Sequence, residues 1–216
     1  MGRWAFPTHG HSKKTTWGKV YFRILLNCID FNLQTKPETE PGAILSATDM
    51  ALIHNVFIRI LNCIYLQAPN VKEEKDISDF IIFTYAWIIT IHEHHSNEEK
   101  LFFPWLEADI GTKGAMEKNV EQHQAFESGV SALEAYVIAV KDGKEKYDGA
   151  KIVVLIDVFG SILAKHLAEE VGTFEELEKL GDKIDWKAWN KKVQKVAVDT
   201  AEKVCVPLLV SLEESS

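Results

Sequence analysis

Apolar residues recur at steps of three and four along most of the chain, which is the spacing of one face of an α-helix. The first such segment begins near Ser46, with Thr48 or Asp49 as its capping residue, and ends near Pro69. Further segments of this kind cover about 77–107, 115–141, 148–180 and 185–203. No stretch from 46 to 203 alternates apolar and polar residues as a strand would. The pattern therefore predicts an all-α protein.

Short polar turns separate the four longer segments, so successive helices are expected to be antiparallel neighbours. We predict an antiparallel up-down four-helix bundle at 45–181, followed by a C-terminal amphipathic helix and tail at 182–216. Residues 1–44 form an irregular N-terminal extension in this interpretation. Its apolar stretch, Val20–Phe31, is compatible with either a strand or a helix.

Composition supports a single domain with a real core, since 46% of the 216 residues are hydrophobic. The net charge of −8 and the lack of a basic cluster argue against nucleic acid as a partner. The longest apolar run, Phe80–Ile91, is shorter than the roughly 20 residues that cross a bilayer, so no membrane partner is expected. Three separated cysteines and an N-terminus without an apolar signal region favour a cytoplasmic protein.

Three histidines are each followed by a glutamate four residues later, a spacing that puts both side chains on one helix face. The pairs are His94 with Glu98, His123 with Glu127, and His166 with Glu170. His95 and Glu99 repeat the spacing one residue further along. Spacing alone does not choose between the two overlapping pairs.

The direction of these pairs distinguishes them from surface salt bridges, because each pair continues an apolar stripe. On the second segment the stripe runs through Trp87 into His94 and Glu98, and His54 lies on the stripe of the first segment. Counting from the loops at about 1.5 Å per residue puts the pairs at similar depth. Unpaired carboxylates in a core are costly, so the pattern predicts one shared cation site.

The motif HHSNEEKLFFP at 94–104 resembles the hemerythrin or HHE cation-binding pattern, in which His-x-x-x-Glu is followed by Phe-Pro. The segments around His54, His123 and His166 are similar to the remaining helices of the fungal hemerythrin-like subgroup. The resemblance covers about 46–180, and its motifs are specific in combination rather than singly.

The resemblance implies a dinuclear site with two iron ions, with manganese or zinc as alternatives, and no separate catalytic residue. The implied ligands are His54, His94, Glu98, His123, Glu127, His166 and Glu170. Glu98 and Glu170 would bridge the ions. The position of Pro104 favours His94 with Glu98 over His95 with Glu99.

Two departures separate this chain from the oxygen-carrying hemerythrins, which have a second histidine where Glu127 stands and an Asp at i+5 where this chain has Glu170 at i+4. Four imidazoles and three carboxylates make a harder site, suited to iron or manganese. The resemblance implies a protein that binds O₂, peroxide or NO for sensing, storage or detoxification. Two alternatives stay open: a diiron enzyme that consumes peroxide or oxidises a small molecule, and an interaction module with a structural metal, contacting partners through Trp186 and Trp189.

Overall fold

The computed structural model describes residues 42–214, without the side chains of 181–182 and 202–214, and all of its regular elements are helical. The elements are α2 (Gly42–Gln67), η1 (Ala68–Asn70), α3 (Glu74–Asn97), η2 (Glu98–Phe102), α4 (Phe103–Ile110), α5 (Glu117–Lys141), α6 (Gly149–Glu176), η3 (Leu177–Lys183) and α7 (Trp186–Glu214). No strand occurs in this part of the chain, which confirms the all-α prediction. The structure predicted for residues 1–41 lies outside the described residues.

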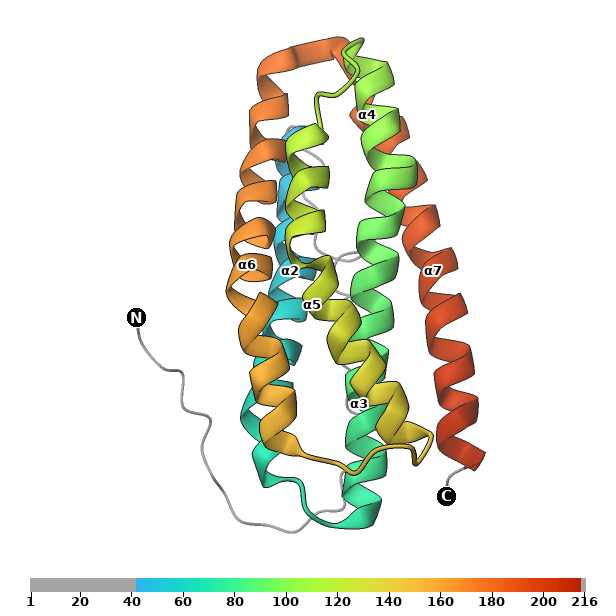
Figure 1. Cartoon of the computed structure of the whole chain (residues 1–216). Helices are drawn as coiled ribbons and strands as arrows, with labels where there is room; N and C mark the ends of the chain where they lie inside the picture. Colours follow the sequence, from blue (N-terminus) through green and yellow to red (C-terminus); the bar gives the residue numbers. More distant parts are fainter. Residues whose placement is uncertain (1–41, 215–216) are drawn as a thin grey trace, which may run out of the picture.

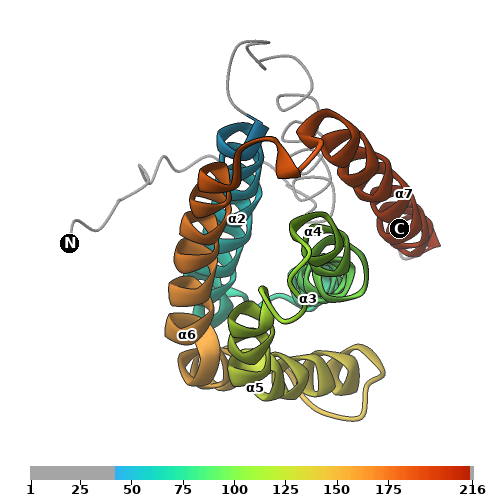
Figure 2. The same cartoon turned by 90° about the horizontal axis from the view of Figure 1, so that it is seen from above.

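Helices α2, α3, α5 and α6 surround a common interior, as the view from above shows (Figure 2). The chain descends along α2, rises through α3 and α4, descends along α5 and rises again along α6 (Figure 1). Helix α6 packs against α2 and α5, and α3 packs against the same two helices, which closes the ring. This arrangement turns one face of each helix toward the same interior.

The second predicted helix contains a wide turn directly after its histidines. Residues 98–102 form a π-helix, in which the Phe103 N–H donates to the carbonyl of Glu98, five residues back. Pro104 follows in the first turn of α4, where its missing N–H is tolerated. A single π turn inserts one residue into a helix and occurs frequently at functional sites. Here it begins at Glu98.

A layer of buried polar side chains separates two apolar clusters in the interior. One cluster lies around α4 and the adjoining ends of α2 and α6, at the upper end in Figure 1. Its members include Met50, Phe102 and Phe174. The other fills the lower part of the bundle and includes Phe57 and Leu163. On every helix of the ring, the polar side chains of the layer fall between residues of the first cluster and residues of the second.

Glycines at two helix contacts hold α5 and α6 close to their neighbours. A Cβ at Gly129 on α5 would lie 2.6 Å from Cβ of Phe159 on α6. A Cβ at Gly149, the first residue of α6, would overlap the carbonyl group of Ala68. Both positions need a residue without a side chain. The close approaches fix the relative height of α2, α5 and α6, and with it the level at which their polar side chains meet.

Helix α7 packs outside the ring, against α3 and α2. Trp189 is buried there and contacts the rings of Phe102 and Phe174, while Trp186 is half-buried beside it. Buried rings favour packing of this helix on the bundle over a role as a partner-binding surface.

Among the described residues, Gly42–Asn70 is the segment that could cross a membrane by length and composition, with a mean hydropathy of 1.4. The core helix of a helical bundle meets the same criterion. Phe57, Ile60 and Ile64 of this segment are buried in the lower apolar cluster. Packing within the bundle therefore accounts for the buried part of this segment, which is 44% of its most apolar window.

Candidate metal centre

Seven imidazole and carboxylate side chains converge in the polar layer, and the ring of four helices contributes all of them. They are His54 on α2, His94 and His95 on α3, Glu98 at the start of η2, His123 on α5, and His166 and Glu170 on α6. All are buried except His94, which is 13% exposed. Histidine nitrogens and carboxylate oxygens are common ligands of transition metals.

The first donor group consists of His54, His94, Glu98 and Glu170, whose ligand atoms all lie within 4.8 Å of one another. Nε2 of His54 is 3.1 Å from Nε2 of His94, which is in turn 3.0 Å from Oε1 of Glu98. Two imidazole nitrogens and two carboxylate oxygens therefore enclose one small volume.

The second donor group consists of His95, His123 and His166, again with ligand atoms within 4.8 Å of one another. The His123 ring centroid lies 4.3 Å from that of His95 and 4.5 Å from that of His166. Each of these imidazoles comes from a different helix, so the group forms only when α3, α5 and α6 pack together.

Two carboxylates connect the groups. Oε1 of Glu98 faces His94, and its Oε2 lies 3.7 Å from Nε2 of His123 in the second group. Oε2 of Glu170 lies 3.4 Å from Nε2 of His54 and 3.5 Å from Nε2 of His166. Each carboxylate therefore reaches both groups, as a bridging ligand must.

The donor atoms fit bound cations because their hydrogen-bonding capacity is otherwise unused. Among the described residues, both carboxylate oxygens of Glu98, Oε2 of Glu170 and Nε2 of all three imidazoles in the second group are buried without a hydrogen-bond partner. Leaving a buried polar atom unsatisfied costs about 1–3 kcal/mol. Cations in the two groups would satisfy these atoms together.

Electrostatics lead to the same conclusion. Burial, with Glu170 and Glu99 nearby, raises the pKa of Glu98 well above its usual value, and burial raises that of Glu170. Burial lowers the pKa of all five imidazoles, to about 3 for His54 and His166 and about 4 for His123. The lowered pKa values leave free lone pairs on the imidazoles, whereas the raised pKa values favour protons on the carboxyl groups that a cation would displace.

Hydrogen bonds at the opposite ring nitrogens point Nε2 into the layer. Nδ1 of His54 donates to the carbonyl oxygen of Leu167 at 2.7 Å. Nδ1 of His123 donates to Oε1 of Glu99 at 2.8 Å, and Nδ1 of His166 to Oε1 of Gln122 at 3.3 Å. Such partners fix the tautomer and the ring orientation of a metal-binding histidine.

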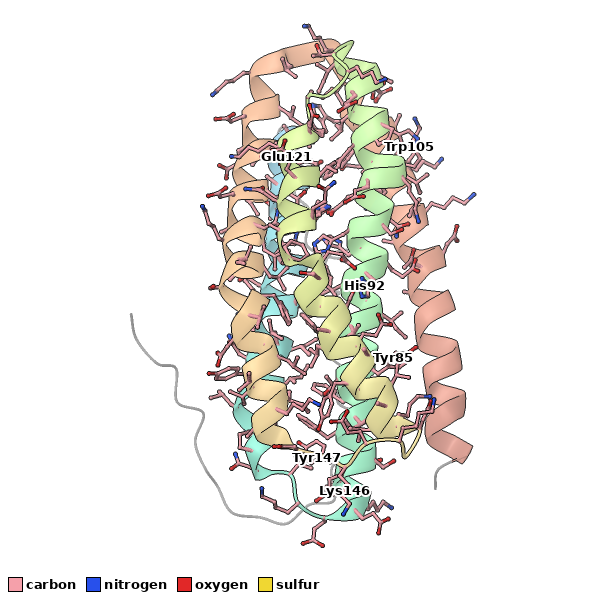
Figure 3. The ribbon with its side chains drawn as sticks, in the orientation of Figure 1. Tyr85, His92, Trp105, Glu121, Lys146 and Tyr147 are labelled. Carbon is pink, nitrogen blue, oxygen red and sulfur yellow. The ribbon has the colours of Figure 1, made fainter. Side chains whose placement is uncertain are left out.

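Glu127 stands apart from both groups, although the resemblance implied it as a ligand. Its side chain is 50% exposed, and its Oε1 lies 3.5 Å from Nδ1 of His92, which Figure 3 shows on α3. The buried stripe of α5 steps by three from His123 to Phe126 and then by four to Val130. The expected step of four after His123 therefore does not occur, and Phe126 takes the inward position.

His95 takes the place in the layer that Glu127 does not fill. The choice of His94 with Glu98 left His95 outside the ligand set, yet its ring is 6% exposed and packs against His123, His166 and Phe126. Successive residues on a helix point about 100° apart, so neighbouring histidines can face two different helices. The sequence therefore allowed His95 to face the interior as well, and the packing of α5 and α6 decided that it does.

Asn119 and Gln122 also contribute to the layer, although neither belongs to a pair of histidine and glutamate four residues apart. The Asn119 side chain is buried and donates to Oε1 of Glu170 at 3.1 Å. Gln122 contacts His166 and donates to Glu169 at 2.6 Å. Asn119 lies four residues before His123, on the same face of α5, so its inward position was visible in the helical spacing.

A helical bundle that buries imidazole and carboxylate donors from four helices at one level has the donor arrangement of a metal-binding bundle. Residues 47–177 match the sequence profile of the family described as Hemerythrin HHE cation binding domain, and the chain belongs to this family. Family and buried donors together indicate that it binds a metal ion.

One similar protein is the dimeric xanthone biosynthesis cluster protein R11 of Cryptosporiopsis sp. (strain 8999), which is 35% identical over 154 residues. The alignment covers 71% of this chain but 58% of the relative, so the chain spans less than two thirds of that protein's length. No solved structure matches the chain.

Proposed function

We propose that the chain holds two iron ions in the polar layer and binds O₂, peroxide or NO there, for sensing, storage or detoxification. The observation that carries this proposal is the pair of buried donor groups connected by Glu98 and Glu170. Iron bound there would supply redox-active ions with a coordination position open to a small ligand. Manganese suits the same donor types and is the main competitor.

The proposal assigns His54 and His94 to one ion and His95, His123 and His166 to the other, with the two carboxylates shared. This set contains five imidazoles and two carboxylates, in place of the four and three expected with Glu127 as a ligand. His95 on α3 would supply the imidazole that oxygen-carrying hemerythrins place on the third helix. His95 therefore compensates for the first departure from those proteins, whereas the second departure, Glu170 at i+4 in place of an Asp at i+5, remains. We also infer the antiparallel up-down order of the four helices, in which these residues meet at one height.

Apolar side chains enclose the layer and favour a small ligand. The Phe57 ring lies 4.9 Å from that of His94, and the Phe126 ring lies 5.0 Å from that of His95. Ile91 is buried on the same side of α3 as the histidines. These groups exclude water, which strengthens electrostatic interactions at the donors. The hydrogen bonds to Glu99, Gln122 and Leu167 orient the imidazole rings.

The proposal is tested by elemental analysis of purified protein reconstituted with ferrous iron and washed free of loosely bound metal. We expect two irons per chain in the wild type and in Glu127→Ala, and loss of at least one in His95→Ala. The reduced wild-type protein should change its absorption spectrum on exposure to O₂, peroxide or NO. Iron-free wild-type protein, or full occupancy in His95→Ala together with loss in Glu127→Ala, would contradict the proposed site.

A second candidate is an enzyme that oxidises a small molecule at the same site, which the name of the similar biosynthesis cluster protein favours. The carboxylates and buried imidazoles serve either function equally well. Steady-state consumption of peroxide or of a phenolic substrate, compared with an equal amount of free iron, separates the two. Turnover well above free iron supports the enzyme, and ligand binding without turnover supports a sensor or store.

A further inference from the structure

Three of the donor imidazoles have a hydrogen-bond partner at Nδ1, and two of these partners are neutral while the third is a carboxylate. His54 donates to a backbone carbonyl, and His166 donates to the neutral amide of Gln122. His123 donates to the carboxylate of Glu99. Of these three contacts, only that of Glu99 can place a full negative charge on the far side of a ligand ring.

Two consecutive carboxyl side chains therefore lie at the two nitrogens of the His123 ring, and only that of Glu99 accepts a hydrogen bond from it. Oε2 of Glu98 lies 3.7 Å from Nε2, and Oε1 of Glu99 lies 2.8 Å from Nδ1. The π turn at 98–102 begins with these two residues. Glu98 is completely buried, whereas Glu99 is 39% exposed at the edge of the bundle. One carboxylate thus belongs to the donor layer, and the next connects the layer with the surface.

We propose that Glu99 is a positioning residue that, through His123, stabilises the higher oxidation state of the ion in the second donor group. The inference rests on the proposed function. A carboxylate that accepts the Nδ1 proton makes the imidazole a more basic ligand. A more basic ligand favours a trivalent over a divalent ion, which lowers the reduction potential of the site. The corresponding hydrogen bond of His166 goes to a neutral amide, and the carboxylate of Glu169 reaches that ring only through Gln122, so the effect there is weaker.

The isosteric substitution Glu99→Gln separates this role from a structural one. Its amide oxygen can still accept the hydrogen bond from Nδ1 of His123, so the ring orientation is retained while the charge is removed. We expect iron content close to that of the wild type. We also expect the preference for ferric over ferrous iron to fall about tenfold, because such partners contribute about 10–100-fold to metal affinity and the lost charge acts mainly on the ferric ion. Tenfold corresponds to about 59 mV more positive for a one-electron couple.

The matched control is Glu127→Gln, which removes one carboxylate charge from the surface four residues after His123. Its midpoint potential is expected to stay at the wild-type value in spectroelectrochemical titrations of the iron-loaded proteins. Circular dichroism checks that both variants are folded.

Each other outcome rejects the inference in a recognisable way. An unchanged potential in iron-loaded Glu99→Gln, or equal shifts in both variants, would overturn it and leave the proposed function intact. Loss of iron from folded Glu99→Gln would show that Glu99 is required for metal loading, and would overturn its role in setting the potential. Absence of iron from the wild type would overturn the proposed function, and this inference with it.

Discussion

The neighbouring histidines His94 and His95 show how single residues divide the donors between two groups. The His94 ring lies 5.2 Å from that of His54, whereas His95 packs against His123. A rotation of about 100° between successive helical residues is enough to send the two rings to different helices. Glu98, one turn later, reaches both groups through its two oxygens.

Removal of Glu98 is expected to affect both ions, because it is the residue of α3 and η2 that contacts both donor groups. In Glu98→Ala, the affinity for both irons should fall at least about tenfold, since even outer partners of metal ligands contribute about 10–100-fold. His54→Ala should weaken mainly the first group. Iron titrations followed by absorbance and by metal content per chain measure both effects. Selective loss of a single iron in Glu98→Ala would argue against its bridging role.

Element packing depends on close helix contacts, of which Gly129 on α5 is the clearest test. In Gly129→Ala the new methyl group would meet Cβ of Phe159, and overpacking of this kind costs about 1–3 kcal/mol. This cost exceeds the roughly 0.5–1 kcal/mol that alanine gains over glycine within a helix. We therefore expect a lower free energy of unfolding, measured by urea denaturation, and weaker iron binding as α5 moves away from α6.

Gly172 on α6 provides the control for this substitution. A Cβ there would meet no atom within 4 Å, apart from its chain neighbours and its own helix backbone. Gly172→Ala should therefore stabilise the protein by about 0.5–1 kcal/mol through helix propensity alone. If both variants changed stability in the same direction, the contact with Phe159 would not be the controlling feature.

The π turn at 98–102 is the element that most affects the site. It follows the histidines directly and places Glu98 inside the bundle and Glu99 at its edge. Phe102 and Phe103, which follow, are both buried in the upper apolar cluster. An α-helical continuation would rotate all later residues relative to α3. The inserted residue therefore allows both the donors of α3 and the apolar residues above them to face the interior.

Across the whole molecule, the polar layer lies between two apolar clusters, so its protonation state affects global stability. The buried carboxyl groups have raised pKa values, so their protonated form stabilises the fold at low pH, and this contribution is lost as pH rises from 4.5 toward about 8 for Glu170. The imidazoles have lowered pKa values, so their contribution is present above 6.5 and is lost as pH falls below it.

Removal of metal should therefore give a distinct stability profile. Below pH 6.5 the stability that five imidazoles lose exceeds the stability that two carboxyl groups gain as the pH falls. Chelator-treated protein should therefore be most stable near pH 6.5 and lose stability between 6.5 and 8. Bound cations replace the carboxyl protons, so iron-loaded protein should not show the loss at higher pH. Thermal melts of both forms at pH 5.5, 6.5 and 8 provide the comparison. Parallel profiles would show that these donors do not hold the metal.

The sequence by itself was sufficient to predict the all-helical class, the approximate extents of the helices and the inward direction of most donors. Helical periodicity is a local property, so His54 and Glu170 could be assigned to buried stripes without knowledge of their neighbours. Tertiary packing decided whether the residues at the edges of those stripes are buried or exposed. Glu127 turns to the surface and His95 turns inward because the position of the adjacent helix, rather than spacing along the chain, determines which flank of a stripe is covered. Partners such as Glu99 depend in the same way on contacts between helices, which no single segment of the sequence contains.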